Sequence, residues 1–170
     1  MGNQSLDFAE FYRRSKEECL FAVLVSVGDR DKAQELVAEG FARAWASWRA
    51  VSRHPAPQAW VVRTALNANV SWWRRRRREV PVPDPGSLTD LPTIEVGDSS
   101  VDPQIMAALL RLSARQRQVI ALRVFLDLDT DRTAEVLGIA PGTVQAHMGR
   151  AIAALRAELV HEPHQEGLPS

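Results

Sequence analysis

The sequence has one cysteine, Cys19, among 170 residues, which excludes an internal disulfide and a cysteine-cluster zinc site. No apolar run approaches the roughly 20 residues that a membrane-spanning helix needs. The first residues lack the basic-then-apolar order of a secretory signal, so we expect a cytoplasmic protein. Cys19 lies in the apolar stretch ECLFAVLV, and we expect it to be a small buried side chain instead of a reactive thiol.

Catalytic motifs are absent as well. The four histidines show no metal-ligand spacing, and the chain contains neither a nucleophile elbow nor a glycine-rich phosphate loop. We therefore expect no catalytic residue, no cofactor and no metal site, and hence a protein that is not an enzyme.

Lysine is scarce, since Lys16 and Lys32 are the two lysines among 21 basic residues. The 21 acidic residues bring the net charge to zero, but the charges are segregated along the chain. Residues 1–80 hold 14 basic and 9 acidic side chains, a net of +5, whereas residues 81–103 hold 5 acidic and no basic ones. Arginine suits the recognition of phosphate groups, so the basic block is a candidate nucleic-acid surface.

The first block has the apolar periodicity of three helices. Leu20, Leu24 and Val27 form a stripe before Gly28 interrupts the pattern. A second helix over about residues 31–48 has an apolar stripe of Val37, Phe41, Ala44, Trp45 and Trp48. After a proline-marked loop, a third helix is expected from Pro57 to Arg78, with a stripe of Val62, Leu66, Val70 and Trp73.

The third helix also carries a polar and basic stripe beside its apolar one. It contains Arg63, Asn67 and Ser71 and ends in the run SWWRRRRR, residues 71–78. Five adjacent arginines repel one another and destabilise a helix unless anions balance them, although a solvated helix end remains an alternative. Trp72 either packs against the protein or stacks on a base.

Prolines and acidic residues separate this block from the next. We divide the chain into a helical domain over residues 1–79, an acidic proline-rich linker over 80–103, a second helical domain over 104–160 and a tail over 161–170. In the second domain, Ile105, Leu109 and Leu112 mark one helix, and a Ser113/Gln116 capping box opens another that runs to about Leu126. The predicted fold is all-α, two small helical domains joined by a flexible linker.

Residues 130–156 have the pattern of a helix-turn-helix. Thr130 can cap a short helix, Gly138 suits a turn with positive φ, and Pro141 opens a second helix. On that second helix, the expected inward stripe is Val144, Met148, Ala151, Ile152 and Leu155. The polar face opposite can enter a major groove. The alternative is an ordinary helical hairpin, whose second helix only packs against the rest of the protein.

With both blocks in place, the chain resembles bacterial RNA polymerase sigma factors of the sigma-70 family, extracytoplasmic-function (ECF) group. The resemblance covers about residues 6–158. Four stretches carry it: GDRDKAQELVAEGFARAWASW, PQAWVVRTALNANVSWWRRRRR, LSARQRQVIALRVFLDL and TAEVLGIAPGTVQAHMGRAIAALR. They are similar to family regions 2.2, 2.3–2.4, 4.1 and 4.2, in this order.

The resemblance implies a transcription-initiation factor that binds core RNA polymerase, double-stranded promoter DNA and the melted −10 strand. An anti-sigma factor is a further partner of many family members. The residues implied at the −10 element are Arg63, Asn67, Ser71, Trp72, Arg74, Arg75, Arg76 and Arg78. Those implied at the −35 element are Thr143, Gln145, Ala146, His147 and Arg150, and those implied at the core polymerase are Glu35, Leu36, Glu39 and Phe41.

Two pairs of positions depart from the family pattern. Where the family usually has Asp-x-x-Gln, this chain has Glu35 and Ala38, and where it often has a basic residue and a serine, this chain has Gln145 and Ala146. The alternative function is a stand-alone helix-turn-helix regulator that binds operator DNA as a dimer. It accounts for the second block but leaves the arginine-rich helix and the acidic linker without a role.

Overall fold

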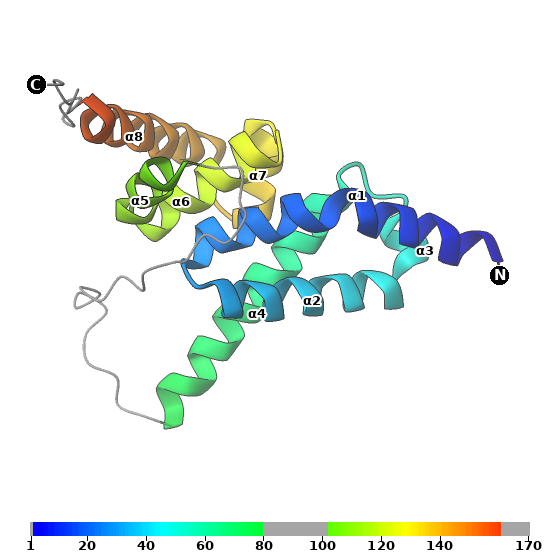
Figure 1. The fold of residues 1–170 in the computed structure, drawn as a ribbon. Coiled ribbons are helices and arrows are strands. Elements are labelled where there is room, and N and C mark those ends of the chain that lie inside the picture. Colours follow the sequence, from blue (N-terminus) through cyan, green and yellow to red (C-terminus); the bar gives the residue numbers. More distant parts are fainter. Residues whose placement is uncertain (1, 80–101, 161–170) are drawn as a thin grey trace, which may run out of the picture.

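The computed structural model describes residues 2–79 and 102–160, apart from the side chains of residues 2–6, 72, 73 and 76–79. Every regular element in these ranges is helical, which confirms the predicted all-α fold (Figure 1). None of the described helices is long and apolar enough to cross a membrane. The elements are α1 (Gly2–Val27), α2 (Arg30–Ala46), α3 (Trp48–Val51), α4 (Pro57–Glu79), α5 (Pro103–Arg111), α6 (Ala114–Ile120), the π-helical η1 (Ala121–Phe125), α7 (Thr130–Leu137) and α8 (Pro141–Val160).

Local capping chemistry sets most of these boundaries. Gly28 has a φ of 79° and separates α1 from α2. The Asp29 carboxylate caps α2 by accepting a hydrogen bond from the backbone N–H of Lys32 at 2.9 Å. The predicted capping box is confirmed, because Ser113 and Gln116 each accept a hydrogen bond from the other's backbone N–H. Asp102 caps α5, while residues 80–101 of the predicted linker lie outside the described residues.

In the first block, α2 crosses α4 at very short range. A Cβ atom at Gly40 would lie 2.9 Å from the carbonyl oxygen of Val61 and 3.2 Å from its Cγ1. Only a residue without a side chain lets the two backbones approach this closely. The crossing fixes α4, the helix with the basic stripe, relative to the rest of the block.

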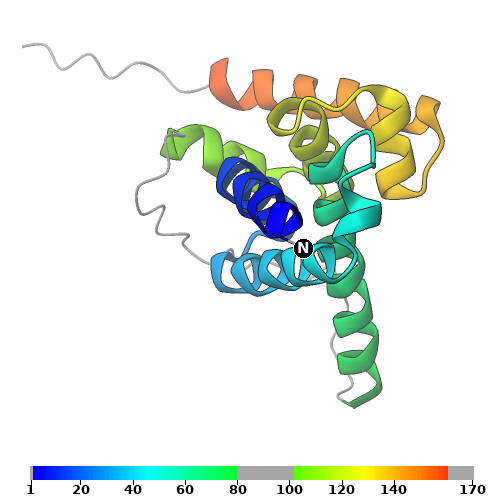
Figure 2. The same cartoon turned by 90° about the vertical axis from the view of Figure 1, so that its right-hand side faces the viewer.

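Helix α1 is the centre of the molecule, because other helices cover its C-terminal half on more than one side. Figure 2 views α1 nearly end-on, with α2 below it and helices of the second block above it. Its buried side chains include Cys19, whose thiol lies 3.9 Å from the carbonyl oxygen of Gln58 in α4. Burial, assisted by the charge of Glu18, raises the pKa of Cys19 to about 12, so the thiol stays protonated and the predicted inert role is confirmed.

The two blocks share one hydrophobic core. Buried residues of α1, α2 and α4 form a single cluster with Met106, Leu109, Ile120 and Leu122 of the second block. The rings of Phe21 in α1 and Phe125 in η1 meet edge to face with centroids 4.4 Å apart. The two predicted helical domains are therefore packed together in this structure.

Three apolar residues that periodicity assigned to buried stripes are exposed. Trp45 is 50% exposed, Val70 48% and Ile105 42%. Met106 takes the buried position in α5, where it is 2% exposed, because α5 turns a different face to the core. The side chain of Trp73, also assigned to a stripe, lies outside the described residues.

Two details of the second block also differ from the sequence-based expectation. The helix expected to reach Leu126 changes at Ala121 to the wider π-helical turns of η1. The cap of α7 is the Asp129 carboxylate, which accepts from the backbone N–H of Arg132 at 2.7 Å, and not Thr130, which is the first helical residue. Gly138 ends α7 with a φ of 64°, as predicted.

A pair of glycine substitutions tests the α2–α4 crossing. Gly40→Ala forces a methyl group against the Val61 carbonyl and should lower the free energy of unfolding by about 1–3 kcal/mol. Gly149→Ala is the matched control, because its added methyl group meets nothing within 4 Å in the interior of α8. It should raise the free energy of unfolding by about 0.5–1 kcal/mol. Urea denaturation measures both, and equal stability of the two variants would contradict the crossing.

The α7 cap is tested by comparing Asp129→Ala with Thr130→Ala. Loss of the Asp129 carboxylate removes the hydrogen bond to the first turn of α7 and should destabilise the protein by about 1 kcal/mol. Thr130→Ala should change stability by less than half of that, since alanine is the better helix former. Thermal unfolding followed by circular dichroism measures both effects. A larger loss of stability for Thr130→Ala than for Asp129→Ala would show that Thr130 is the cap, as the sequence predicts.

Candidate nucleic-acid interface

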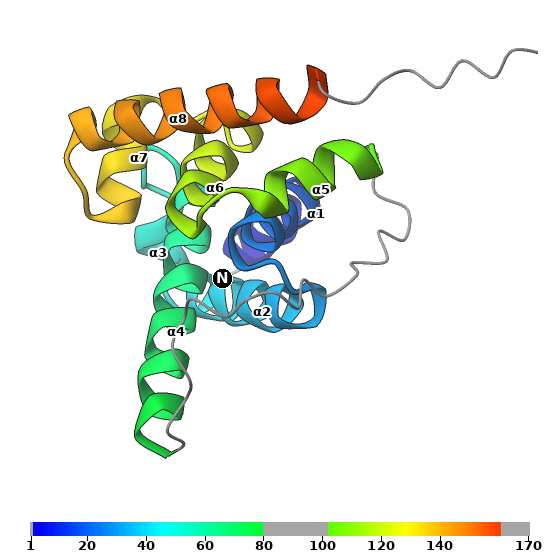
Figure 3. The ribbon, with the colours of Figure 1, turned by 90° about the vertical axis from the view of Figure 1, so that its left-hand side faces the viewer.

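The basic stripe of α4 is exposed along its whole described length. Val61, Val62 and Ala65 are buried against the core, and this places Arg63, Asn67 and Ser71 on the solvent side. Arg74 and Arg75 are exposed as well, whereas the side chains of Trp72, Arg76 and Arg78 lie outside the described residues. The C-terminal half of α4 projects from the body of the molecule (Figure 3), so this stripe is reachable from several directions.

The arginines of this stripe have no acidic partner among the described residues. No ion pair in that part of the chain involves Arg63, Arg74 or Arg75. By contrast, Arg13 and Arg14 of α1 both pair with Glu10, at 3.0 and 2.7 Å, and Arg43 of α2 pairs with Glu39 at 2.6 Å. The α4 stripe thus offers uncompensated positive charge, which phosphate groups can balance.

Helices α7 and α8 form the predicted helix-turn-helix. A small cluster of Val119, Ala134 and Val144 joins α6, α7 and α8, and Ala134 is the small residue at the crossing. After Gly138, the backbone N–H of Ile139 donates to the carbonyl oxygen of Ala134 at 3.1 Å, which closes the turn. The start of α8 is therefore held in a fixed orientation relative to α7.

The N-terminal half of α8 presents an open polar face. Thr143, Gln145, Ala146 and Arg150 are exposed, and Val144 and Ala151 are buried on the opposite side. His147 is half-buried, and its Nδ1 atom is buried without a hydrogen-bond partner among the described atoms. The predicted face is thus fully accessible except at His147.

Two arginines of α6 donate hydrogen bonds to carbonyl oxygens at the ends of α5 and α7. Arg117 donates to the carbonyl oxygens of Leu110 and Leu112 at 3.3 and 2.9 Å, and its burial lowers the pKa of the guanidinium group. Arg115 donates to the carbonyl oxygen of Leu137 at 3.5 Å, next to the turn. These arginines satisfy carbonyl groups at helix ends, and their role is structural.

The two polar faces lie at opposite ends of the molecule. Figures 1 and 3 place α8 along one side, while the free end of α4 extends from the other. Helices α1 and α2 lie between them. Each face is exposed, but a single nucleic-acid segment would have to pass around the body to reach both.

The four residues expected to bind a protein partner divide into two pairs. Glu35 and Glu39 are exposed on α2, where they pair with Lys32 and Arg43 at 3.6 and 2.6 Å. Leu36 and Phe41 are each 4% exposed and belong to the core. Glu35 and Glu39 are therefore the two exposed members of this set.

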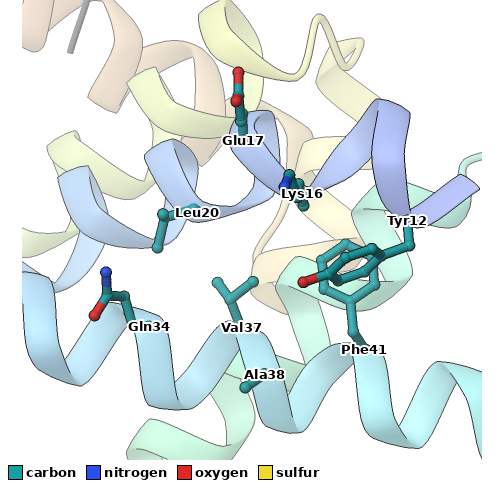
Figure 4. Close-up of a pocket in the computed structure, with 8 residues that line it drawn as sticks. All are labelled: Tyr12, Lys16, Glu17, Leu20, Gln34, Val37, Ala38 and Phe41. Atoms are coloured by element: carbon teal, nitrogen blue, oxygen red, sulfur yellow. The ribbon is translucent and has the colours of Figure 1, made fainter. Parts of the chain in front are cut away.

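A groove of about 370 Å³ lies between α1 and α2 (Figure 4), and its polar lining is supplied by Lys16, Glu17 and Gln34. Tyr12 and Phe41 meet edge to face at one end of it, with centroids 4.9 Å apart. Leu20 and Val37 supply its apolar walls, and Ala38 also borders it. An apolar side chain of another protein would fit this groove better than a charged one.

Sequence reasoning did not identify this groove. Tyr12, Lys16 and Gln34 line it, yet none of them stands out in the apolar pattern of its helix. The sequence does place aromatic residues on both helices that border the groove. In the structure, Tyr12 and Trp45 are exposed and both contact Phe8, so they belong to one aromatic cluster. Within the described residues, no group of histidines, cysteines or carboxylates could hold a metal ion.

Comparison with known proteins identifies both blocks. A family model described as "Sigma-70 region 2" matches residues 12–79, and one described as "Sigma-70, region 4" matches residues 103–155. The first match contains α4 and the groove, and the second contains the helix-turn-helix.

Curated relatives and solved structures agree with these matches. The chain is 31% identical to RNA polymerase sigma-E factor of Streptomyces coelicolor, over 91% of this chain and 87% of the relative. It is 32% identical to ECF RNA polymerase sigma factor SigL of Mycobacterium tuberculosis, over 78% and 77%. The structure of sigma factor RpoE in complex with the anti-sigma factor NepR from Bartonella quintana shares the fold, with a TM-score of 0.71 at 23% identity and coverage of 92% and 99%. The chain belongs to the sigma-70 family, in its extracytoplasmic-function group, and is a sigma factor of transcription initiation.

Proposed function

We propose that this chain uses three separate surfaces in one initiation complex: the α1–α2 groove for core RNA polymerase, α4 for the −10 element and α8 for the −35 element. The observation that carries the proposal is the presence of two exposed DNA-type faces on one chain, with unpaired arginines on α4 and a helix-turn-helix face on α8. A stand-alone regulator would use α8 alone. It would leave the uncompensated charge of α4 without a ligand.

At the −35 element, α8 would lie in the major groove with its N-terminal half against the bases. Gln145 can pair with an adenine edge, and Arg150 can reach a guanine or a phosphate. Ala146 offers a methyl-sized surface where the family often has serine, so it would contact a thymine methyl group instead of a phosphate.

At the −10 element, the promoter strands must separate, and α4 would hold the single strand. Arg63, Arg74 and Arg75 would neutralise backbone phosphates, together with Arg76 and Arg78. Asn67 and Ser71 lie on the same face as Arg63 and Arg74 and could hydrogen-bond an unstacked base. Trp72 would stack on a neighbouring base.

Core polymerase would bind across α1 and α2. The apolar groove between them is lined by Leu20 and Val37 and suits an apolar side chain of the partner, while the exposed Glu35 and Glu39 would contact the partner outside the groove. Leu36 would act from beneath, by holding α2 against the core, whereas Phe41 also lines one end of the groove. We place this function in the cytoplasm with the polymerase, and we assign no catalytic step to the chain itself.

Co-elution with core polymerase tests this proposal against the alternative. A sigma factor forms a stable complex with core polymerase in size-exclusion chromatography before any DNA is added. A stand-alone regulator elutes separately from the polymerase and binds its operator without it. Failure to co-elute, with a known sigma factor binding the same polymerase preparation, would reject the proposal.

Arg150→Ala tests the α8 face. The substitution should weaken promoter binding by about 1–3 kcal/mol if the side chain contacts a base, with relaxed specificity at one −35 position. Arg156→Ala is the control, because Arg156 is also exposed on α8 but lies beyond the N-terminal half. Binding of the polymerase complex to a set of promoter variants measures the effect. An equal loss in both variants would remove Arg150 from the interface.

The double substitution Arg74→Gln/Arg75→Gln tests the α4 stripe. It should weaken promoter binding and reduce the slope of log K against log salt by about 1.4–1.8, since each lost phosphate contact accounts for about 0.7–0.9. Arg13→Gln/Arg14→Gln removes the same charge from α1, where both arginines pair with Glu10. The slope of this control should match the wild type. If the salt dependence of the α4 variant is unaltered, Arg74 and Arg75 do not contact phosphate, and the arginine run is only a solvated helix end.

A further inference from the structure

His147, on the N-terminal half of α8, has a ring that is divided between the protein interior and solvent. Thr143, Ala146 and Arg150 of the same half are exposed, whereas His147 is half-buried. Its Nδ1 atom is buried without a hydrogen-bond partner among the described residues, while its Nε2 atom is neither buried nor hydrogen-bonded there. The two ring nitrogens therefore have different surroundings, and only Nε2 can meet a ligand.

The buried nitrogen determines which hydrogen-bonding group the ring offers. A neutral imidazole carries its proton on one nitrogen and accepts a hydrogen bond at the other. A proton on Nδ1 of His147 would be a buried N–H group without an acceptor, and such groups are rarer in proteins than buried acceptors without a donor. The burial of Nδ1 thus favours the proton on Nε2, so that His147 presents a neutral N–H donor at the surface of α8.

This donor lies at one edge of the polar face of α8. Thr143 lies one turn before His147 and Arg150 one turn after it, so the three form a column of hydrogen-bond donors along the helix. Ala151, also one turn away, is fully buried, which places His147 at the boundary between the polar face and the core. When a helix lies in a major groove, the residues at the edges of its face approach the sugar-phosphate backbone.

We propose that His147 donates a hydrogen bond from Nε2 to a backbone phosphate of the −35 element, and that this neutral contact positions α8 in the groove. The inference rests on the proposed function and adds a positioning residue to the α8 face. A phosphate oxygen only accepts hydrogen bonds, so it matches a ring whose accessible nitrogen donates. Because the imidazole is neutral, its contact releases no counterion, in contrast to an arginine contact.

Glutamine and asparagine each replace one of the two ring nitrogens. The amide nitrogen of His147→Gln reaches about as far from the backbone as Nε2, whereas that of His147→Asn reaches only as far as Nδ1. His147→Gln should therefore keep the affinity of the polymerase complex for promoter DNA. His147→Asn should lower it about three- to tenfold, as expected for one hydrogen bond. Circular dichroism verifies folding, and His147→Leu replaces His147→Asn if the asparagine variant unfolds.

Two further measurements separate a phosphate contact from a base contact and from a charged one. The loss in His147→Asn should be the same on promoters that differ in the −35 element, because a phosphate carries no sequence information. The slope of log K against log salt should match the wild type in both His147 variants. Arg74→Gln/Arg75→Gln is the comparison, since it removes charge and should reduce this slope.

The tautomer is measured in the free full-length chain from the nitrogen-15 chemical shifts of the His147 ring, in mildly alkaline buffer. The signal that is missing in His147→Gln belongs to this residue, and its proton should lie on Nε2. A proton on Nδ1 would overturn the inference, as would wild-type affinity in His147→Asn or a lower affinity in His147→Gln.

Losses confined to particular −35 sequences would assign His147 to a base, and a slope reduced by about 0.9 in His147→Gln would show a charged ring. Either result would also reject the neutral phosphate contact. Failure of the proposed function is distinguishable from these outcomes, because the wild-type chain itself would then bind neither the polymerase nor the promoter.

Discussion

The structure depends on the burial of one helix, the C-terminal half of α1, on two sides. One side is covered by α2 and α4, which carry the groove and the arginine stripe, and the other by the block that carries the helix-turn-helix. An apolar helix without either cover would expose a continuous hydrophobic surface to water. The same residues therefore stabilise each block and determine whether the two blocks stay together.

The arginines differ in whether an acidic side chain of the protein neutralises them. Arg13 and Arg14 of α1 and Arg43 of α2 are neutralised within the protein, by Glu10 and Glu39 respectively. Those on α4 have no such partner among the described residues, and Arg150 on α8 likewise takes part in no described ion pair. Both candidate DNA faces thus carry exposed arginines for which phosphate is the expected counter-ion. The net charge of zero conceals this division.

Much of the fold could be predicted from local sequence, because caps, glycines and prolines act over a few residues. Ser113 with Gln116, Gly138 and Pro141 mark boundaries that the structure confirms. Apolar periodicity predicts which face of a helix is buried, but it does not predict how much of that face the adjacent helices cover. Trp45 and Val70 lie on predicted buried faces and are exposed, because the adjacent helices do not cover them. The packing of the two blocks could not be predicted either, since Phe21 and Phe125 are 104 residues apart, and nothing local links them. At the candidate site, Leu36 and Phe41 are buried because α2 needs them for its own packing.

The central claim is that one chain presents two DNA-reading faces which act on one promoter through the polymerase. In vitro transcription with core polymerase on a library of genomic fragments tests this most directly. The account predicts transcripts that begin at discrete positions and depend on this chain, from templates that share two sequence elements at a constant spacing. Start sites that share a single element, or no template-specific transcripts from a polymerase that responds to another sigma factor, would contradict it.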